Sequence, residues 1–237
     1  GDVALRKWSV LLDRFEGDDF AIPEARLERS YDQLSAEVRG VIQQSAKRIR
    51  DFHERQPVTS WLSEEMGGQL GQRFTAVERV GVYVPGGTAP LPSSLLMSVI
   101  PAQVAGVKRI FVATPPNPHP AILAAAYVCG ITEIFQIGGA QAIAALAFGT
   151  QSIPKVDKIV GAGNLFVTLA KQQLYGIVGL DGLAGPTETM VIADQSANPA
   201  WVAADLLAQA EHDVQASAIL LTTDEGIARA VQEAVSS

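Results

Sequence analysis

The sequence predicts an α/β protein with a largely parallel sheet and helices on both faces. Beyond residue 78, short apolar runs rich in β-branched and aromatic residues alternate with longer helical runs. Alternation at this spacing is typical of βαβ units, whose strands run parallel. A composition of 48% hydrophobic and 18% charged residues is that of a globular protein. The chain of 237 residues is long enough for one large α/β domain or two smaller ones.

The strand-like runs occupy residues 79–84, 109–114, 133–138 and 157–161. Helices are expected to begin near Ser93, Pro118, Ala140 and Asn164. Two further strands are expected at residues 189–194 and 216–223, on either side of a helix over 198–212. Asn198 is a favourable N-cap for that helix and Pro199 a favourable first residue.

An amphipathic pattern precedes the first of these strands. Apolar residues recur at helical spacing from Tyr31 to Gln56, which predicts one long helix. The chain begins inside a charged, helix-like segment without a capping residue, and we therefore expect a further segment upstream. We expect residues 1–80 and 184–237 to form one discontinuous α/β domain, with residues 81–183 inserted as a second.

Composition also restricts the partners of the protein. The formal net charge of -7 argues against nucleic acid, whose binding proteins usually carry a basic patch. No apolar run is long enough to span a bilayer, and the N-terminal residues do not resemble a signal peptide, so a cytoplasmic location is expected. The single cysteine, Cys129, lies in an apolar helical stretch and is expected to be a packed thiol.

Four glycine-rich turns are candidates for ligand binding. They lie at residues 85–87, 138–141, 161–164 and 185–188, and three of them directly follow an expected strand. Ligands of open α/β sheets bind at the carboxyl ends of the strands, where glycine lets the backbone approach closely. Each turn alone is also explained by sheet geometry. The GxGxxG dinucleotide fingerprint and the GxxxxGK[ST] phosphate loop are absent from the sequence, so the pattern predicts a ligand cleft without naming its ligand.

One helix edge carries a possible metal pair. Gln209 and His212 are three residues apart, so an amide oxygen and an imidazole nitrogen can meet one ion. Two ligands do not complete a zinc site, and a histidine that caps a helix end is the ordinary alternative. His53 and His119 are expected in surface or capping roles.

Several motifs occur together in the order typical of one family. They are VGVYVPGGTAPLPSSLLMSVIPAQVAG, IGGAQAIAALAFGTQSIPKVDKIVGAGN, LAGPTETMVIAD and LLAQAEHD, which begin at residues 80, 137, 183 and 206. In these motifs the chain resembles the first half of the histidinol dehydrogenases, without their extreme N-terminus. Ala162 stands where the family usually has proline, and Thr187 where it usually has serine; both leave the backbone or hydroxyl chemistry available.

The resemblance implies two incomplete Rossmann-like α/β domains of aldehyde-dehydrogenase type, one inserted in the other, in a homodimer. It implies that Tyr83, Gln141 and Asn164 contact NAD, that Thr187 contacts substrate, and that Gln209 and His212 bind both zinc and substrate. The implied reaction belongs to histidine biosynthesis and oxidises L-histidinol to L-histidine in two NAD-dependent steps.

The resemblance also implies that no catalytic residue lies within this chain, because the family's glutamate–histidine pair lies beyond residue 237. Residues 1–237 alone are therefore expected to be inactive. Two rival interpretations remain. The chain is a non-catalytic folding or assembly fragment, or it is an enzyme like the aldehyde dehydrogenases. The second needs a catalytic cysteine in a loop, and Cys129 lies in an expected helix.

Overall fold

The computed structural model describes residues 1–17, 19–56, 58–65, 67–86, 90–185, 188–211 and 215–236. The chain divides into two compact units, residues 1–183 and residues 184–237. Within the described ranges, no helix is both long enough and apolar enough to cross a membrane.

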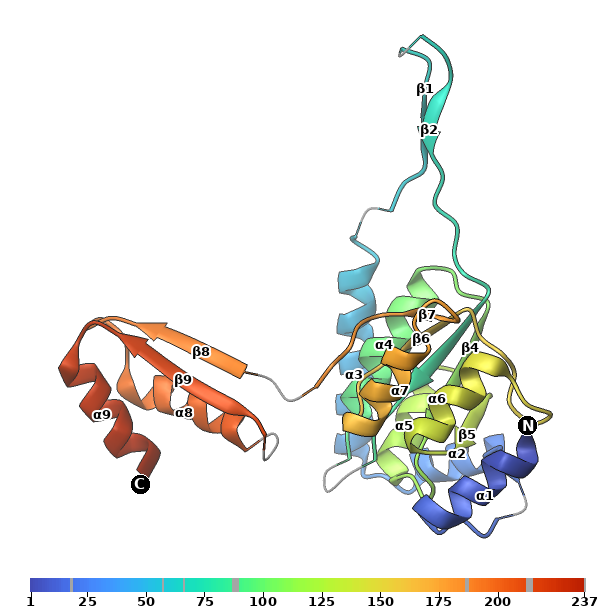
Figure 1. Ribbon diagram of the computed structural model, residues 1–237, viewed down its shortest axis with the longest axis horizontal. Helices are drawn as coiled ribbons and strands as arrows, with labels where there is room; N and C mark the ends of the chain where they lie inside the picture. Colours follow the sequence, from blue (N-terminus) through green and yellow to red (C-terminus); the bar gives the residue numbers. More distant parts are fainter. Residues whose placement is uncertain are drawn as a thin grey trace. The chain divides into compact units, whose positions relative to one another are not determined.

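A parallel sheet forms the centre of the first unit (Figure 1). Its strands, in spatial order, are β5 (Ile134–Gln136), β4 (Arg109–Thr114), β3 (Arg79–Tyr83), β6 (Lys158–Val160) and β7 (Gly179–Leu180). The first four correspond to the four strand-like runs, so the α/β class and the parallel sheet are confirmed. The short strand β7 was not expected.

The strand order places a topological switch point between β3 and β6. From β3 the chain passes outward to β4 and β5 on one side, then crosses back to β6 and β7 on the other. Such an order is Rossmann-like, and ligands bind outside the carboxyl ends of the strands at the switch point. We name this side of the sheet the carboxyl edge, comprising the turns at residues 84–86, 115, 137–139 and 161–164.

Alternating strand residues supply a hydrophobic core on each face of the sheet. On one face Val80, Val82 and Val112 pack with residues of α4 (Pro92–Val104) and α5 (Pro120–Val128). On the other, Tyr83 and Phe111 pack with residues of α6 (Gly139–Phe148) and α7 (Leu165–Gln173). Burial on both faces explains the nearly continuous apolar composition of the strands.

Three helices before the sheet pack against this unit. Leu5 of α1 (Asp2–Asp13) joins the core that contains α6. Leu27 of α2 (Glu24–Asp32) and Ile42 of α3 (Ala36–His53) join the core that contains α4 and α5. These helices, all before residue 54, therefore pack with the cores of the first unit. That residues 1–80 and 184–237 form one discontinuous domain stays a prediction.

The long helix expected from Tyr31 to Gln56 is confirmed as α3 over Ala36–His53, but its expected start is wrong because Tyr31 belongs to α2. The chain leaves α2 after Asp32 and enters α3 at Ala36. Ser35 ends the continuity because its Oγ accepts a hydrogen bond from the backbone N–H of Val38 at 3.2 Å, which caps α3. A two-stranded antiparallel hairpin, β1 (Trp61–Ser63) and β2 (Leu70–Gln72), follows and was also not expected.

The second unit is a β-α-β-α segment. Strands β8 (Glu188–Ala193) and β9 (Ser217–Thr222) pair in parallel, with α8 (Pro199–Ala210) between them and α9 (Glu225–Ser236) after them. As expected, Asn198 caps α8, its Oδ1 accepting from the N–H of Ala200 at 2.9 Å. One face of the strand pair packs on the helices, and the other exposes the apolar side chains of Met190, Ile192, Ile219 and Leu221.

Candidate functional site at the carboxyl edge

Tyr83, the last residue of β3, joins two of the glycine turns. Only 3% of this residue is exposed, and its Oη accepts a hydrogen bond from the backbone N–H of Gly139 at 3.0 Å. A Cβ atom at Gly163 would lie 2.8 Å from the Tyr83 ring, so the absence of a side chain there lets the ring pack against the turn. Burial raises the pKa of Tyr83, and the nearby Asp13 carboxylate raises it further. Tyr83 is therefore a neutral phenol.

Gln141 lies in the first turn of α6 and is fixed by Asp13, the last residue of α1. The Gln141 Nε2 donates to Asp13 Oδ2 at 2.7 Å, across 128 positions of sequence. Burial raises the pKa of Asp13, while the Gln141 amide and the backbone N–H of Gly138 lower it. One carboxylate therefore holds both the side chain and the turn that carries it.

Asn164 forms the N-cap of α7, immediately after the turn that follows β6. Its Oδ1 accepts from the backbone N–H of Val167 at 3.2 Å, which satisfies one of the unpaired donors of the first helical turn. Since Oδ1 is committed to the helix, the Nδ2 group is the part of this side chain that suits a ligand acceptor.

The turn before Asn164 is shaped by Gly161. Its φ of +107° belongs to a region that glycine adopts freely, and a Cβ atom there would lie 2.1 Å from the backbone oxygen of Tyr83. Gly161 thereby brings the turn after β6 against the end of β3, at the switch point. The structure thus brings Tyr83, Gln141 and Asn164 to the same edge of the sheet. Their contact with NAD, which the resemblance implies, stays a prediction.

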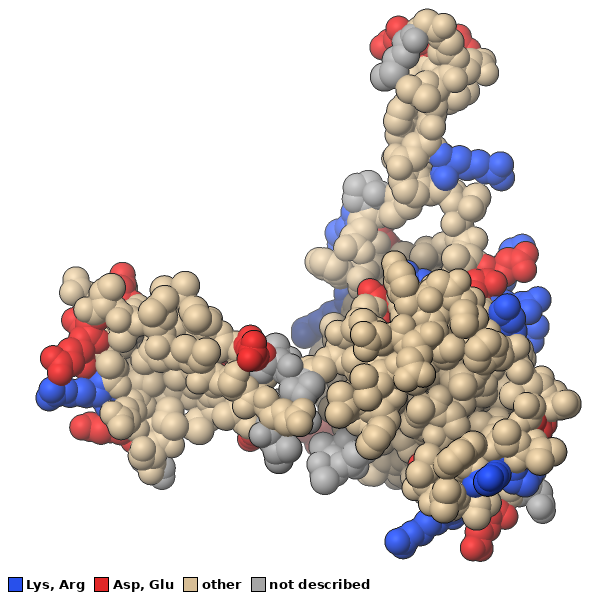
Figure 2. All heavy atoms as spheres, in the orientation of Figure 1, with Lys and Arg blue, Asp and Glu red and all other residues tan. Residues whose placement is uncertain are grey.

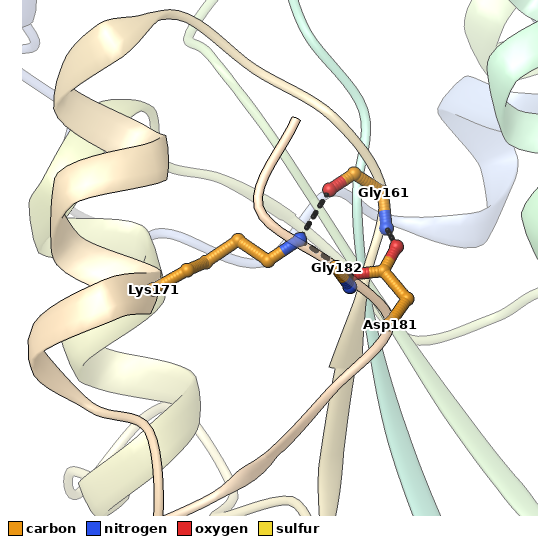
Figure 3. A network of polar contacts seen from close by, with 4 residues as sticks. All are labelled: Gly161, Lys171, Asp181 and Gly182. Carbon is orange, nitrogen blue, oxygen red and sulfur yellow. Dashed lines mark hydrogen bonds and ion pairs between the residues drawn. The ribbon is translucent and has the colours of Figure 1, made fainter. Parts of the chain in front are cut away.

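An ion pair between the buried Lys171 and the partly exposed Asp181 holds both backbone polar groups of Gly161 (Figure 3). Lys171 of α7 extends toward the turn and donates from Nζ to the carbonyl oxygen of Gly161 at 2.9 Å. The same ammonium lies 2.5 Å from Asp181 Oδ1, and Asp181 Oδ2 accepts from the N–H of Gly161 at 2.7 Å. The backbone N–H of Gly182 also donates to Asp181 Oδ1, at 2.7 Å. This network fixes the conformation of the turn.

Sequence reasoning missed Asp13, Lys171 and Asp181. The sequence pattern could have indicated a special role for Lys171, since it is a charged residue on a largely apolar helix. No pattern indicated Asp13 or Asp181, because their partners are far away in the sequence or belong to an irregular turn.

The surface over α6 and α7 carries few charged side chains (Figure 2). A groove of about 510 Å³ runs between α1 and α6, lined mostly by apolar residues, with Gln141 in its wall. Its lining includes Leu5, Trp8, Leu12, Ala144 and Phe148.

The proposed substrate and metal residues lie in the second unit or outside the described ranges. Gln209 is half-buried in the last turn of α8, whereas Thr187 and His212 lie outside the described residues. Among the described residues, no group of three or more histidine, cysteine, aspartate or glutamate side chains is arranged to hold a metal ion. The zinc assignment and the substrate roles of Gln209, His212 and Thr187 therefore stay predictions.

The single cysteine, Cys129, and the histidines His119 and His53 have structural roles. Cys129 is buried at the C-cap of α5, and burial raises the pKa of its thiol to about 11. His119 caps α5, since its Nδ1 accepts from the N–H of Ala121 at 3.1 Å. His53 ends α3, with its Nδ1 2.7 Å from Gln56 Oε1. The expectations for a packed thiol and a capping histidine are confirmed.

Comparison with known families gives a match over the whole chain. The sequence model of the histidinol dehydrogenase family matches residues 1–237. The chain belongs to the histidinol dehydrogenase family.

Members of that family from several bacteria align over nearly the entire chain. The histidinol dehydrogenase of Geobacillus kaustophilus is 52% identical over 240 residues, covering 99% of this chain and 57% of its own length. That of Aquifex aeolicus is 50% identical over 237 residues, covering 99% of this chain and 55% of its own length. This chain therefore spans little more than half the length of the histidinol dehydrogenases that it matches.

Solved structures agree with the family assignment. The crystal structure of histidinol dehydrogenase from Elizabethkingia anophelis superposes with a TM-score of 0.93 and 42% identity, covering 99% of this chain and 56% of that one. A candidate aldehyde dehydrogenase from Burkholderia cenocepacia superposes with a TM-score of 0.51 and 18% identity, covering 98% of this chain and 48% of that one. The second similarity shows a shared fold alone.

Proposed function

We propose that the intact protein is an L-histidinol dehydrogenase of histidine biosynthesis, and that this chain supplies its NAD contacts. The observation that carries the proposal is the convergence of Tyr83, Gln141 and Asn164 on the carboxyl edge, where the strand order changes direction. Binding at this position is usual for cofactors of open α/β sheets.

The side chains at this edge suit a dinucleotide. Within the described residues, Gln141 Oε1 is buried without a hydrogen-bond partner, and it can accept from a ligand donor. Asn164 Nδ2 can donate to a ligand oxygen, because the Oδ1 atom caps α7. The N–H of Gly139 is already bound by Tyr83, so the start of α6 is held by the protein itself.

When bound, NAD would supply the hydride acceptor for two successive oxidations, alcohol to aldehyde and aldehyde hydrate to acid, with one NAD reduced and one proton released in each. Tyr83, Gln141 and Asn164 would hold the dinucleotide, and the Lys171–Asp181 pair would keep the Gly161 turn in place beneath it.

Substrate and metal contacts would come from the second unit and the residues beside it. Gln209 and His212 would give zinc an amide oxygen, which is an uncommon zinc ligand, and an imidazole nitrogen, which is a common one, and would also touch L-histidinol. Thr187 would contribute a hydroxyl to the substrate. The described residues do not complete a metal site. The homodimer and the cytoplasmic location likewise remain predictions.

The two rival interpretations predict different measurements. An enzyme of aldehyde-dehydrogenase type needs a reactive thiolate, which a buried Cys129 with a pKa raised to about 11 does not provide. A folding or assembly fragment would give no heat in a calorimetric titration with NAD.

The decisive experiment measures NADH formation from L-histidinol by the intact protein, with wild type and Gln141→Leu compared. The variant is expected to raise KM for NAD about ten-fold, as for one lost hydrogen bond in a buried site, with KM for L-histidinol unchanged. Failure of the wild-type protein to form NADH from L-histidinol would overturn the proposal.

A further inference from the structure

The contact between Asp13 and Gln141 restricts what the proposed cofactor site can recognise. Gln141 has an amide with one donor end and one acceptor end, and a carboxylate can only accept hydrogen bonds. The end that faces Asp13 at 2.7 Å is therefore the NH₂ group, Nε2. Rotation of the amide by half a turn would set Oε1 against a carboxylate oxygen, and two acceptors repel.

The other end of the amide remains available. Gln141 is only 9% exposed, and within the described part of the chain its Oε1 has no hydrogen-bond partner. A Cβ atom at Gly139 would lie 2.9 Å from Oε1, so the amide oxygen is folded back over the turn at the carboxyl edge. A buried acceptor without a donor is unfavourable, and a ligand donor placed there removes the penalty.

Asp13 is held independently of Gln141. It is the last residue of α1, and the backbone N–H of Gly138 also stabilises its carboxylate. At the other end of α1, Ser152 donates from its backbone N–H and its hydroxyl to the Asp2 carboxylate. Since contacts hold α1 at both ends, the Asp13 carboxylate has a fixed position beside the Gln141 amide.

We propose that Asp13 is a positioning residue for the cofactor. By binding Nε2 it sets Gln141 as an acceptor, so the ligand group beside Gln141 must be a hydrogen-bond donor. This inference rests on the proposed function, in which Gln141 contacts NAD. The donors of NAD are the adenine amino group, the ribose hydroxyls and the carboxamide NH₂ of nicotinamide, and one of these meets Gln141.

The test is a double-mutant cycle on the intact protein, with the Kd for NAD measured by calorimetry. Asp13→Ala frees the amide and is expected to weaken NAD binding about five- to ten-fold, while Gln141→Leu removes the contact and weakens it about ten-fold. If Asp13 acts through Gln141, adding Asp13→Ala to Gln141→Leu leaves the Kd unchanged. A purely structural role would instead give additive losses.

A swapped pair provides a second test that does not remove the contact. When Asp13→Asn is combined with Gln141→Glu, the introduced amide donates to the introduced carboxylate, whose second oxygen remains an acceptor, and the net charge is preserved. Recovery of the wild-type Kd is expected, and a Kd as weak as that of Gln141→Leu overturns the inference. This test holds even if Asp13→Ala fails to fold. Asp157→Ala is the control, and its Kd for NAD is expected to match that of wild type. Asp157 accepts from the N–H of Arg79 at 2.8 Å, at the ends of the strands opposite to the carboxyl edge.

The outcomes separate the two proposals. If Gln141→Leu binds NAD like wild type, the proposed NAD contact fails and the inference fails with it. If Gln141→Leu weakens binding while Asp13→Ala does not, or if the losses add, the inference alone is overturned.

Discussion

Lys171 Nζ lies 2.5 Å from Asp181 Oδ1, although only 2% of the lysine side chain is exposed. The aspartate is less buried, with 38% of its side chain exposed, and it also accepts hydrogen bonds from the N–H groups of Gly161 and Gly182. The ammonium therefore depends on its partner more than the carboxylate does.

Asp181→Ala is expected to cost more stability than Lys171→Met. Loss of the carboxylate leaves a buried cation uncompensated, and we expect a decrease of about 2–4 kcal/mol in the free energy of unfolding, below the full cost for a dry pair because Asp181 is partly solvated. Lys171→Met leaves a carboxylate with two backbone donors and is expected to cost about 1–2 kcal/mol. Urea denaturation measures both.

Lys47→Met is the matched control. Lys47 Nζ also lies 2.5 Å from a carboxylate, that of Asp51, but 73% of its side chain is exposed. Its removal is expected to leave the denaturation midpoint unchanged, since water already solvates both charges. A loss at Lys171→Met as large as that at Asp181→Ala would contradict the asymmetry.

Gly161→Ala is expected to destabilise the first unit by about 3 kcal/mol or more. The added Cβ meets the Tyr83 carbonyl oxygen, and alanine strongly disfavours a φ of +107°. Gly40→Ala is the control because nothing lies within 4 Å of a Cβ at that helical position, and it is expected to add about 0.5–1 kcal/mol. Relative to wild type, the Tm of Gly161→Ala should fall and the Tm of Gly40→Ala should rise.

Substitutions at Asn164 are expected to separate its capping role from its proposed ligand role. Asn164→Asp keeps an oxygen for the N–H of Val167, so stability is retained, but it loses the NH₂ donor proposed to contact a ligand oxygen. We expect NAD binding about ten-fold weaker, as for one lost hydrogen bond. Asn164→Ala also loses the cap and about 1 kcal/mol of stability. Unchanged NAD affinity in Asn164→Asp would remove this residue from the site.

Cys129 is expected to resist alkylation in the folded protein. Burial raises its pKa from 9.0 to about 11, so at pH 8 the thiolate fraction is about 100-fold below that of an unfolded chain. Because the folded state holds the proton more tightly, this group adds stability below pH 9 that is lost as the pH rises toward about 11. Iodoacetamide labelling with and without urea measures the protection. Equal rates at pH 8 would contradict burial of the thiol.

Much of this protein follows from local pattern. The strands at residues 79–83, 109–114, 134–136 and 158–160 lie where short β-rich runs predicted them, because a strand buried on both faces must be apolar throughout. The glycine turns at residues 138–141 and 161–164 and the Asn198 cap were predictable for the same kind of reason, since backbone conformation and helix ends restrict the residue types nearby. The motifs identify the family because several of them recur together in order.

The tertiary structure decided which of these local features act together. Ser35 caps α3 at a point where the apolar periodicity of the sequence runs on without a break, and α2 and α3 are separate helices there. Asp13 reaches Gln141 across 128 positions, and Lys171 meets Asp181 only because the crossover after β6 returns the chain to the sheet. A single charged residue carries no record of its partner in the sequence. Pairing depends on distance in space, which only the packed sheet and helices set.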